Sequence, residues 1–217
     1  MNQLSFSLIR IGITAAIVGI VFYSIILHEI SHAWAAYALG DDSAKRAGRL
    51  SLNPLKHIDI FGTIILPLIL YFSAGFIYGY AKPVPFNPYN FRNFKRDSGF
   101  TALAGPVSNI LIAILLSVIF HLCASLPFVQ GILIYVIFLN LLLAFFNLIP
   151  VPPLDGSKVL GMFLSDQAYF KWTAQERKGM LYLFAIIIGS NLLGLNLIGK
   201  LILPPVGFAM RLLGLPF

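Results

Sequence analysis

The sequence predicts an all-α fold: a polytopic membrane helical bundle with four to six membrane segments and a short β or irregular segment between the first two. Of its 217 residues, 59% are hydrophobic and only 11% are charged, whereas an average soluble domain is about 25% charged. The mean hydropathy is +0.87, and the apolar residues form several long runs separated by short polar segments. Such a chain cannot cover a water-facing surface, so we expect a lipid bilayer around it.

The first apolar run is the longer of the first two, and glycine and proline interrupt the second. The first covers about Leu8 to Leu39 and exceeds the roughly 20 residues that a bilayer requires, so its end is expected to leave the membrane or to line a protein cavity. Gly40 ends this run, and the polar residues 41–59 follow, with an edge strand predicted near "GRLSLN" (48–53). The second run, Ile60 to Tyr80, is interrupted by Gly62, Pro67, Gly75 and Gly79.

Three further apolar runs complete the predicted bundle. The third begins at "FTALAGPVSN" and ends near His121, and the fourth extends from about Gly131 to Asn147. The last covers about Met180 to Leu203. It is predicted to stop at Pro204-Pro205, because proline lacks the amide hydrogen that continues a helix. We expect the remaining residues, "VGFAMRLLGLPF", to form an interfacial helix or a tail.

The distribution of basic residues predicts the orientation of the bundle. The net charge is +7, and lysine and arginine are frequent in Lys45–Lys56, Lys82–Arg96 and Lys158–Lys178, whereas Cys123–Gln130 carries no charge. The positive-inside rule places the neutral loop outside and the three basic segments inside the cell. By parity, Ile60–Tyr80 is then expected to dip into the membrane and return; the alternative is an ordinary span, which its length would also suit. This pattern indicates a lipid bilayer as partner and no nucleic acid.

A metal-binding pattern lies inside the first apolar run. In "HEISH", His28 and His32 are four residues apart, so on a helix both imidazoles lie on one face and can reach one metal ion. Glu29 is adjacent and can act on a water molecule there. On a helix this HExxH pattern is a signature of zinc hydrolases in which the glutamate is the general base. Ionisable residues are costly inside a membrane segment, which favours a functional role over hydrogen bonds between helices.

A catalytic zinc site needs a third protein ligand and leaves one position for water. Asp155 is the preferred candidate, because it lies in the strongly apolar "NLIPVPPLDGSKVL". The prolines before it must interrupt the fourth helix, and Gly156 permits unusual backbone angles, so we expect its carboxylate on an unwound segment. A single cysteine excludes a cysteine zinc finger and an intrachain disulfide. Weaker candidates for the third ligand are Asp59, His57 and His121.

These motifs carry a family resemblance. "HEISH", "LNPLKHID", "AGPVSN" and "NLIPVPPLDG" occur in this order and resemble the site-2 protease family of intramembrane zinc metalloproteases, in particular its compact bacterial and archaeal members. The resemblance implies one Zn2+ per chain, with His28, His32 and Asp155 as ligands and Glu29 as the catalytic base. It also implies that Asn147 orients substrate or stabilises the oxyanion. Many members carry a PDZ or CBS domain, which this sequence does not show, so regulation by such a domain is not expected.

Two further asparagines, Asn109 and Asn140, are candidates for contact with the substrate or the oxyanion. Asn140 and Asn147 are seven residues apart and share one face of the fourth helix. They form a narrow polar strip that is a candidate water path to the metal, with a hydrogen bond between helices as the alternative. Asn109, in the third run, is a candidate for lining the cavity. Gly105 and Pro106 are interpreted as sites of close helix packing.

The sequence therefore predicts a single membrane-embedded domain over residues 1–217, with a catalytic core of about residues 8–165. Its predicted function is a zinc endopeptidase that hydrolyses a peptide bond in or near the transmembrane segment of a membrane-protein substrate, as in regulated intramembrane proteolysis. The predicted location is the bacterial or archaeal cytoplasmic membrane, as a multi-pass protein. The alternative is a zinc transporter or a metal-binding membrane scaffold. Transporters seldom need a glutamate beside the histidine, and they tend to show inverted repeats, which we do not find.

Overall fold

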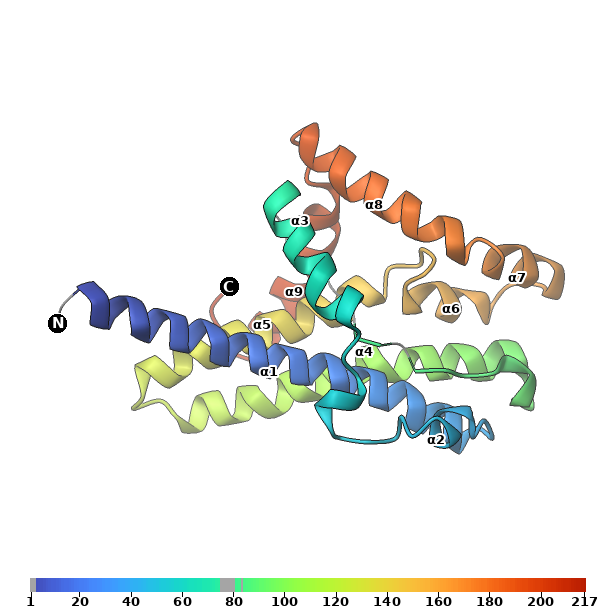
Figure 1. The fold of residues 1–217 in the computed structure, drawn as a ribbon, viewed down its shortest axis with the longest axis horizontal. Helices are drawn as coiled ribbons and strands as arrows, with labels where there is room; N and C mark the ends of the chain where they lie inside the picture. The colour runs from blue at the N-terminus through green and yellow to red at the C-terminus, as the bar shows by residue number, and fades with distance from the viewer. Residues whose placement is uncertain (1–2, 75–80, 83) are drawn as a thin grey trace.

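The structure, a computed structural model, is a bundle of α-helices (Figure 1). It describes residues 3–74, 81–82 and 84–217. Within these ranges every regular element is helical and no strand occurs. The predicted all-helical fold is therefore confirmed.

Three long helices run alongside one another in the centre of the bundle (Figure 1): α1 (Gln3–Ala38), α4 (Phe94–Leu122) and α5 (Pro127–Asn147). In each, the apolar part is long enough to cross a membrane, and two shorter apolar segments, Ile60–Ser73 and Lys178–Ser190, accompany them. α4 packs against both α1 and α5. Residues at the start of α4 and α5 favour helix initiation there. The side chain of Asn93 caps α4, and Pro127 occupies the first turn of α5.

The C-terminal part of the chain forms four helices: α6 (Asp155–Gly161), α7 (Asp166–Thr173), α8 (Glu176–Leu192) and α9 (Leu197–Leu212). The prediction of one apolar run over Met180–Leu203 is wrong, because the chain turns between α8 and α9. Asn196 adopts a left-handed conformation there, with φ of 44°. Its side chain accepts a hydrogen bond from the amide of Gly199 and so caps α9.

The prediction that Pro204 and Pro205 end a helix is also wrong. Both residues lie inside α9. Proline removes backbone hydrogen bonds from a helix interior, which is costly. The same helix buries Val206 and Met210, which are 0% and 1% exposed, in the main hydrophobic core. Burial of two such side chains contributes about 1.5–3 kcal/mol each. Tertiary packing against α5 therefore maintains the helix through the two prolines.

Where the structure describes it, the connection between α1 and α4 contains short helical segments: α2 (Ser43–Arg46), η1 (Pro54–Lys56), η2 (Ile60–Ile65, a π-helix), α3 (Leu66–Ala74) and η3 (Pro88–Asn90). The edge strand predicted at residues 48–53 is not formed. The buried guanidinium of Arg49 donates to the carbonyl of Lys56. The ring of His57 donates from Nε2 to the carbonyl of Ser51 over 2.8 Å. These side chains hold the segment as a folded loop, and His57 occupies the Ser51 carbonyl, which a strand would offer to a neighbour.

The residues that flank the second apolar run, His57 and Lys82, lie side by side. The amide of Lys82 donates to the carbonyl of His57 over 2.8 Å, so the chain returns to the point from which η2 and α3 depart. These elements form a continuous helical segment over residues 60–74, about 22 Å long at 1.5 Å per residue and short of the ~30 Å hydrocarbon core. Whether Ile60–Tyr80 dips into the membrane and returns, as predicted, or spans it stays a prediction, since part of this run is not described. Residues 75–80 lie outside the described part of the chain.

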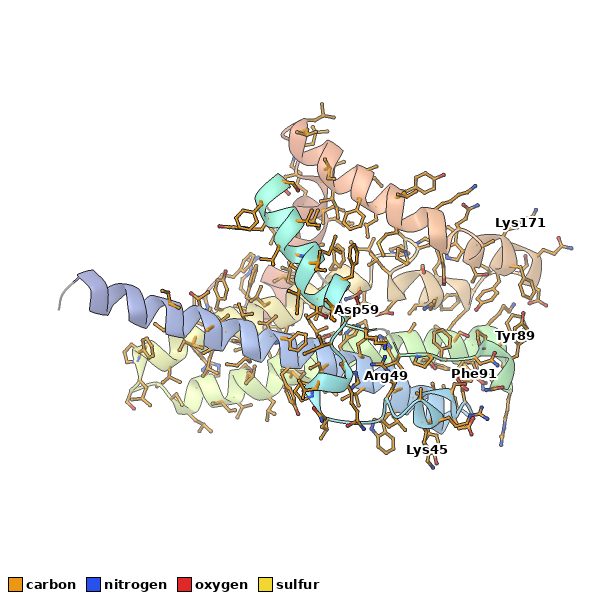
Figure 2. All side chains as sticks on the ribbon, in the orientation of Figure 1. Lys45, Arg49, Asp59, Tyr89, Phe91 and Lys171 are labelled. Carbon is orange, nitrogen blue, oxygen red and sulfur yellow. The ribbon has the colours of Figure 1, made fainter. Side chains whose placement is uncertain are left out.

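Polar and basic segments gather at one end of the bundle. Figure 2 shows Lys45, Tyr89 and Lys171 at the end away from the N-terminus, near α2 and α7. The uncharged connection between α4 and α5 lies at the opposite end (Figure 1). The basic segments therefore share one end of the bundle, and the assignment of that end to the inner side of the membrane stays a prediction.

A buried carboxylate fixes the loop that leads into α4. Asp41 is 0% exposed and accepts hydrogen bonds from three residues. Ser43 Oγ and the side-chain amide of Asn90 donate to Oδ1 over 2.6 and 2.7 Å, and the backbone amide of Asn87 donates to Oδ2 over 2.6 Å. Burial alone would raise the pKa of Asp41, but these hydrogen bonds together hold the pKa below its usual value.

Asp41→Asn is expected to destabilise the fold in a pH-dependent way. Because the pKa of Asp41 is lowered on folding, its ionised form stabilises the protein above the unfolded-state pKa of about 3.9. This contribution is lost as the pH falls through the folded-state pKa. In detergent, the Tm of the wild type should exceed that of the variant at neutral pH, and the margin should shrink below about pH 4. Asp42→Asn is the control, since the Asp42 side chain is 48% exposed; equal effects of both substitutions would contradict the assignment.

Candidate metal centre

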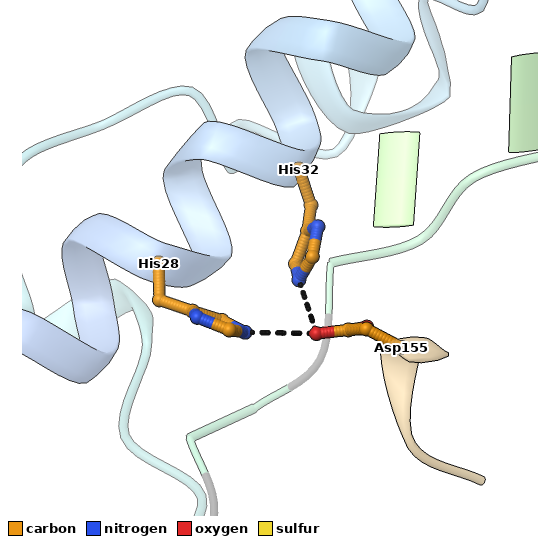
Figure 3. Close-up of side chains that lie close together, drawn as sticks. All are labelled: His28, His32 and Asp155. Carbon is orange, nitrogen blue, oxygen red and sulfur yellow. Dashed lines mark hydrogen bonds and ion pairs between the residues drawn. The ribbon is translucent and has the colours of Figure 1, made fainter. Parts of the chain in front are cut away.

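The two histidines of "HEISH" lie one turn apart on α1, and both rings project to the same side of the helix (Figure 3). His28 is only 4% exposed. Asp155, the first residue of α6, faces both rings. Its Oδ2 lies 3.1 Å from His28 Nε2 and 3.3 Å from His32 Nε2. The structure thus brings Asp155 to two histidines that are far from it in sequence, with one ligand atom of each of the three residues within 4.8 Å of the others.

The spacing of these three groups suits a tetrahedral zinc ion. Zinc bonds to nitrogen and oxygen are about 2.0–2.1 Å long, which places two ligand atoms of a tetrahedron about 3.3 Å apart. The observed separations between the carboxylate oxygen and the two ring nitrogens are 3.1 and 3.3 Å. Two imidazoles and one carboxylate are also a donor set of catalytic zinc sites, in which the fourth position is left for water. The residues present therefore fit the metal.

Each imidazole is held through its other nitrogen. His28 Nδ1 lies 2.6 Å from Asn109 Oδ1, and His32 Nδ1 lies 2.7 Å from the carbonyl oxygen of Thr101. Both oxygens only accept hydrogen bonds, so each Nδ1 carries the hydrogen. Nε2 of both rings then carries the lone pair that a metal requires, and both Nε2 atoms face Asp155.

The orientation of Asn109 is itself fixed from α5. A backbone carbonyl can only accept, so the contact of 2.9 Å with the Val136 carbonyl identifies Nδ2 of Asn140 as the donor. Oδ1 of Asn140 then faces Nδ2 of Asn109 over 3.0 Å. This leaves Oδ1 of Asn109 for the ring of His28. A chain of hydrogen bonds therefore leads from the Val136 carbonyl on α5 through Asn140 and Asn109 to His28 on α1, and it fixes the tautomer of His28.

α4 approaches the two rings closely because residue 105 is glycine. A Cβ atom at Gly105 would lie 2.4 Å from His32 Nε2 and 2.6 Å from His28 Nε2, far inside van der Waals contact. Gly156 allows a similar approach behind Asp155, where a Cβ atom would lie 2.2 Å from the carbonyl oxygen of Leu148. Gly105 therefore permits the close helix packing that was predicted for it. Its lack of a side chain also leaves room for the two imidazoles.

A cavity of about 250 Å³ opens beside the three converging groups. Glu29 lines it, and Glu29 Oε2 accepts a hydrogen bond from the Val84 amide over 3.3 Å. Asn147, the last residue of α5, also lines the cavity. Asn109 and Asn140 are 0% and 1% exposed and are not among the lining residues. Of the three candidate asparagines, only Asn147 is therefore in a position to meet a substrate directly.

Several known proteins are similar in sequence to this chain. The sequence model of peptidase family M50 matches residues 123–190. YwhC of Bacillus subtilis (strain 168), which is named as a zinc metalloprotease, is 38% identical over 182 residues, covering 78% of this chain and 80% of YwhC. The chain belongs to peptidase family M50. The resemblance to site-2 proteases is thus confirmed, and zinc is the cofactor of this M50 chain.

Other relatives of the M50 chain carry the same designation. Rip2 of Mycolicibacterium smegmatis (strain ATCC 700084 / mc(2)155) is 27% identical over 181 residues, which cover 82% of this chain and 68% of Rip2. MJ0611 of Methanocaldococcus jannaschii is 33% identical over 137 residues, which cover 62% of this chain and 63% of MJ0611. Both are named as zinc metalloproteases. No solved structure gives a significant match.

The weaker ligand candidates of the M50 chain are engaged in local structure. His57 donates to a carbonyl of its own loop. Asp59 caps η2, where its Oδ1 accepts from the Gly62 amide over 2.7 Å. His121 donates from Nε2 to the carbonyl of Leu213 over 2.9 Å. These contacts leave the cluster of His28, His32 and Asp155 as the candidate metal-binding group among the described residues.

Asn140→Leu is expected to lower zinc affinity about tenfold or more, because residues that orient metal-ligating histidines typically contribute 10–100-fold. Leucine cannot accept from Asn109, so the amide of Asn109 no longer holds Nδ1 of His28. Chelator competition on purified protein measures the affinity. Ser117→Ala is the matched control: it removes another buried polar side chain, which bonds only within α4. Unchanged zinc affinity in Asn140→Leu would contradict the orienting role.

Proposed function

We propose that this M50 peptidase hydrolyses a peptide bond in or near the transmembrane segment of a membrane-protein substrate, as in regulated intramembrane proteolysis. The observation that carries the proposal is the position of His28, Glu29 and His32 within Ile11–Ala38, a helix long and apolar enough to span a membrane. Ionisable groups on such a helix face a protein-lined or watered cavity and act at membrane depth. A transmembrane protein is the substrate that reaches this depth, in the cytoplasmic membrane of a bacterium or archaeon.

The proposal assigns a role to each residue of the centre. His28, His32 and Asp155 hold one zinc ion. When bound, zinc polarises the scissile carbonyl and lowers the pKa of a water molecule to about 7. Glu29 lines the same cavity but is not part of the converging cluster, which suits a general base that accepts the proton of the attacking water and returns it to the leaving amine. Asn147, on the cavity wall, hydrogen-bonds the substrate backbone or the oxyanion.

Asn109 and Asn140 are positioning residues in this proposal. Their side-chain amides are occupied by His28, by each other and by a backbone carbonyl. They therefore hold the imidazole in the tautomer that a metal requires and make no contact with substrate. This role replaces the predicted contact with substrate or oxyanion at these two positions.

A proteomic comparison tests the proposed function. Membrane fractions from cells that express the wild type or Glu29→Gln are analysed for protein fragments and their new termini. We expect the wild type to produce fragments that end within transmembrane segments, and the variant to accumulate the intact proteins. Equal fragment levels in both strains would contradict proteolysis by this site. Fragments that end only in water-soluble domains would contradict its intramembrane character.

A further inference from the structure

A lysine lies on the wall of the cavity beside the metal centre. Lys158 is the one basic side chain among the described residues that line this cavity. It follows Asp155 by three residues on α6, so both side chains lie on one side of that helix. Its Nζ atom is 4.8 Å from the ring centroid of Phe86, which lines the cavity from the loop before α4. This distance is within the ~6 Å range of a cation–π contact.

The ammonium group of Lys158 has no carboxylate partner in the described part of the chain. The lysine and arginine ion pairs found there involve Arg46, Lys95 and Arg96. The two carboxylates beside Lys158 have other contacts, since Asp155 faces both histidines and Glu29 accepts from the Val84 amide. A partly buried charge without a counterion is costly, and an aromatic ring compensates for only part of the lost hydration. The site therefore holds a cation that an incoming anion would stabilise.

The position of Lys158 is fixed relative to the metal-binding cluster. The carbonyl of Ser157 accepts a hydrogen bond from Trp172 Nε1 over 3.0 Å. Gly156 lies directly against the carbonyl of Leu148. These contacts hold both sides of the first turn of α6, from which Asp155 and Lys158 both project. The backbone from which Lys158 projects is thus fixed beside Asp155, and the ammonium reaches the cavity on a flexible stem.

We propose that Lys158 is a specificity-determining residue that binds an aspartate or glutamate side chain of the substrate next to the scissile bond. The inference rests on the proposed function, since it concerns the substrate of that same site. The substrate carboxylate replaces the ring of Phe86 as the partner of the ammonium and forms a charge-assisted hydrogen bond. A lysine or arginine at the same substrate position is repelled. The cavity therefore selects for a negative charge beside the scissile bond.

Cleavage of a peptide library tests this inference. The probes are single-span peptides in detergent micelles, randomised across one end of the span and the adjoining polar segment, and mass spectrometry reads the residues on both sides of each cut. The zinc-loaded wild type should favour Asp or Glu over Asn or Gln about tenfold at one position, as expected for a hydrogen bond between charged groups. Lys158→Gln should lose this preference, and Lys158→Glu should shift it toward Lys and Arg. Lys171→Gln, an exposed lysine on α7, is the matched control and should keep it.

The outcomes separate this inference from the function on which it rests. Cleavage without any acidic preference would overturn the role of Lys158 and leave the peptidase function intact, as would a preference that persists in Lys158→Gln. Absence of all Glu29-dependent cleavage would overturn the proposed function and this inference with it. Zinc content is measured for every variant to show that its site is folded. If Lys158→Glu fails to fold, Lys158→Gln still decides the result.

Discussion

Purified Glu29→Gln is expected to keep about one zinc per chain and to lose cleavage by about 10²–10⁴-fold, the usual contribution of a general base. Glu29 is not one of the three groups that converge within 4.8 Å, so the substitution leaves the donor set unchanged. The glutamine amide can still accept from the Val84 amide, as the carboxylate does, but it cannot take up a proton. The measurement combines metal analysis with cleavage of a membrane peptide.

The sequence offers a matched control for this substitution. Glu176, the first residue of α8, is the only other glutamate in the chain. Glu176→Gln removes the same charge and should cleave at the wild-type rate. Wild-type cleavage by Glu29→Gln would contradict the mechanism. Loss of zinc from Glu29→Gln would instead place Glu29 among the ligands.

Gly105→Ala is expected to lower zinc affinity about 100-fold, and cleavage with it, because overpacking typically costs about 1–3 kcal/mol. The added Cβ atom would lie 2.4–2.6 Å from ring atoms of His28 and His32. Rotation of either ring would break the contact of its Nδ1 with Asn109 or Thr101. The imidazoles therefore cannot relieve the clash and keep their metal-binding orientation. Chelator competition and thermal denaturation of the purified variant measure both effects.

Gly131→Ala is the control for Gly105→Ala. Gly131 lies in α5, and a Cβ atom there meets nothing within 4 Å. Because alanine favours a helix over glycine by about 1 kcal/mol, this variant should keep its zinc affinity and have an equal or higher Tm. Wild-type zinc affinity in Gly105→Ala would show that α4 and the two rings are not in close contact.

The residues of the candidate metal centre could be predicted where a short stretch of sequence identifies them. The four-residue spacing of His28 and His32 places both rings on one face of any helix, whatever the surrounding fold. Asp155 could be selected because prolines interrupt the apolar sequence before it. The structure brings its carboxylate to 3.1 and 3.3 Å from the two rings. The ligand role of the three residues stays a prediction until the metal is measured.

The support behind the rings could not be predicted, because it depends on how α1, α4 and α5 pack. Asn109 and Asn140 were recognisable as polar residues in apolar helices, but no sequence pattern shows that one orients the other. The partner of His32 is the backbone carbonyl of Thr101, which any residue type would provide. The sequence therefore carries no signal for that contact.

The same limit applies to the irregular parts of the fold. The long apolar runs predicted α1, α4 and α5, since burial in lipid depends on composition and length alone. The loop held by Asp41 is fixed by hydrogen bonds to residues 87 and 90, which lie more than 40 positions away. The prolines of α9 were read as a helix end, yet packing of that helix against α5 outweighs their local effect. Long-range contacts of this kind have no periodic signature in the sequence.

Zinc analysis of Asp155→Ala tests the account most directly, because the proposed chemistry depends on a three-residue site. Purified wild type should contain about one zinc per chain, and Asp166→Ala, which removes an exposed aspartate from α7, should match it. Asp155→Ala should bind zinc at least tenfold more weakly, since it leaves only two of the three ligands that catalytic zinc takes. Retention of one zinc per chain with wild-type affinity in Asp155→Ala would contradict the site.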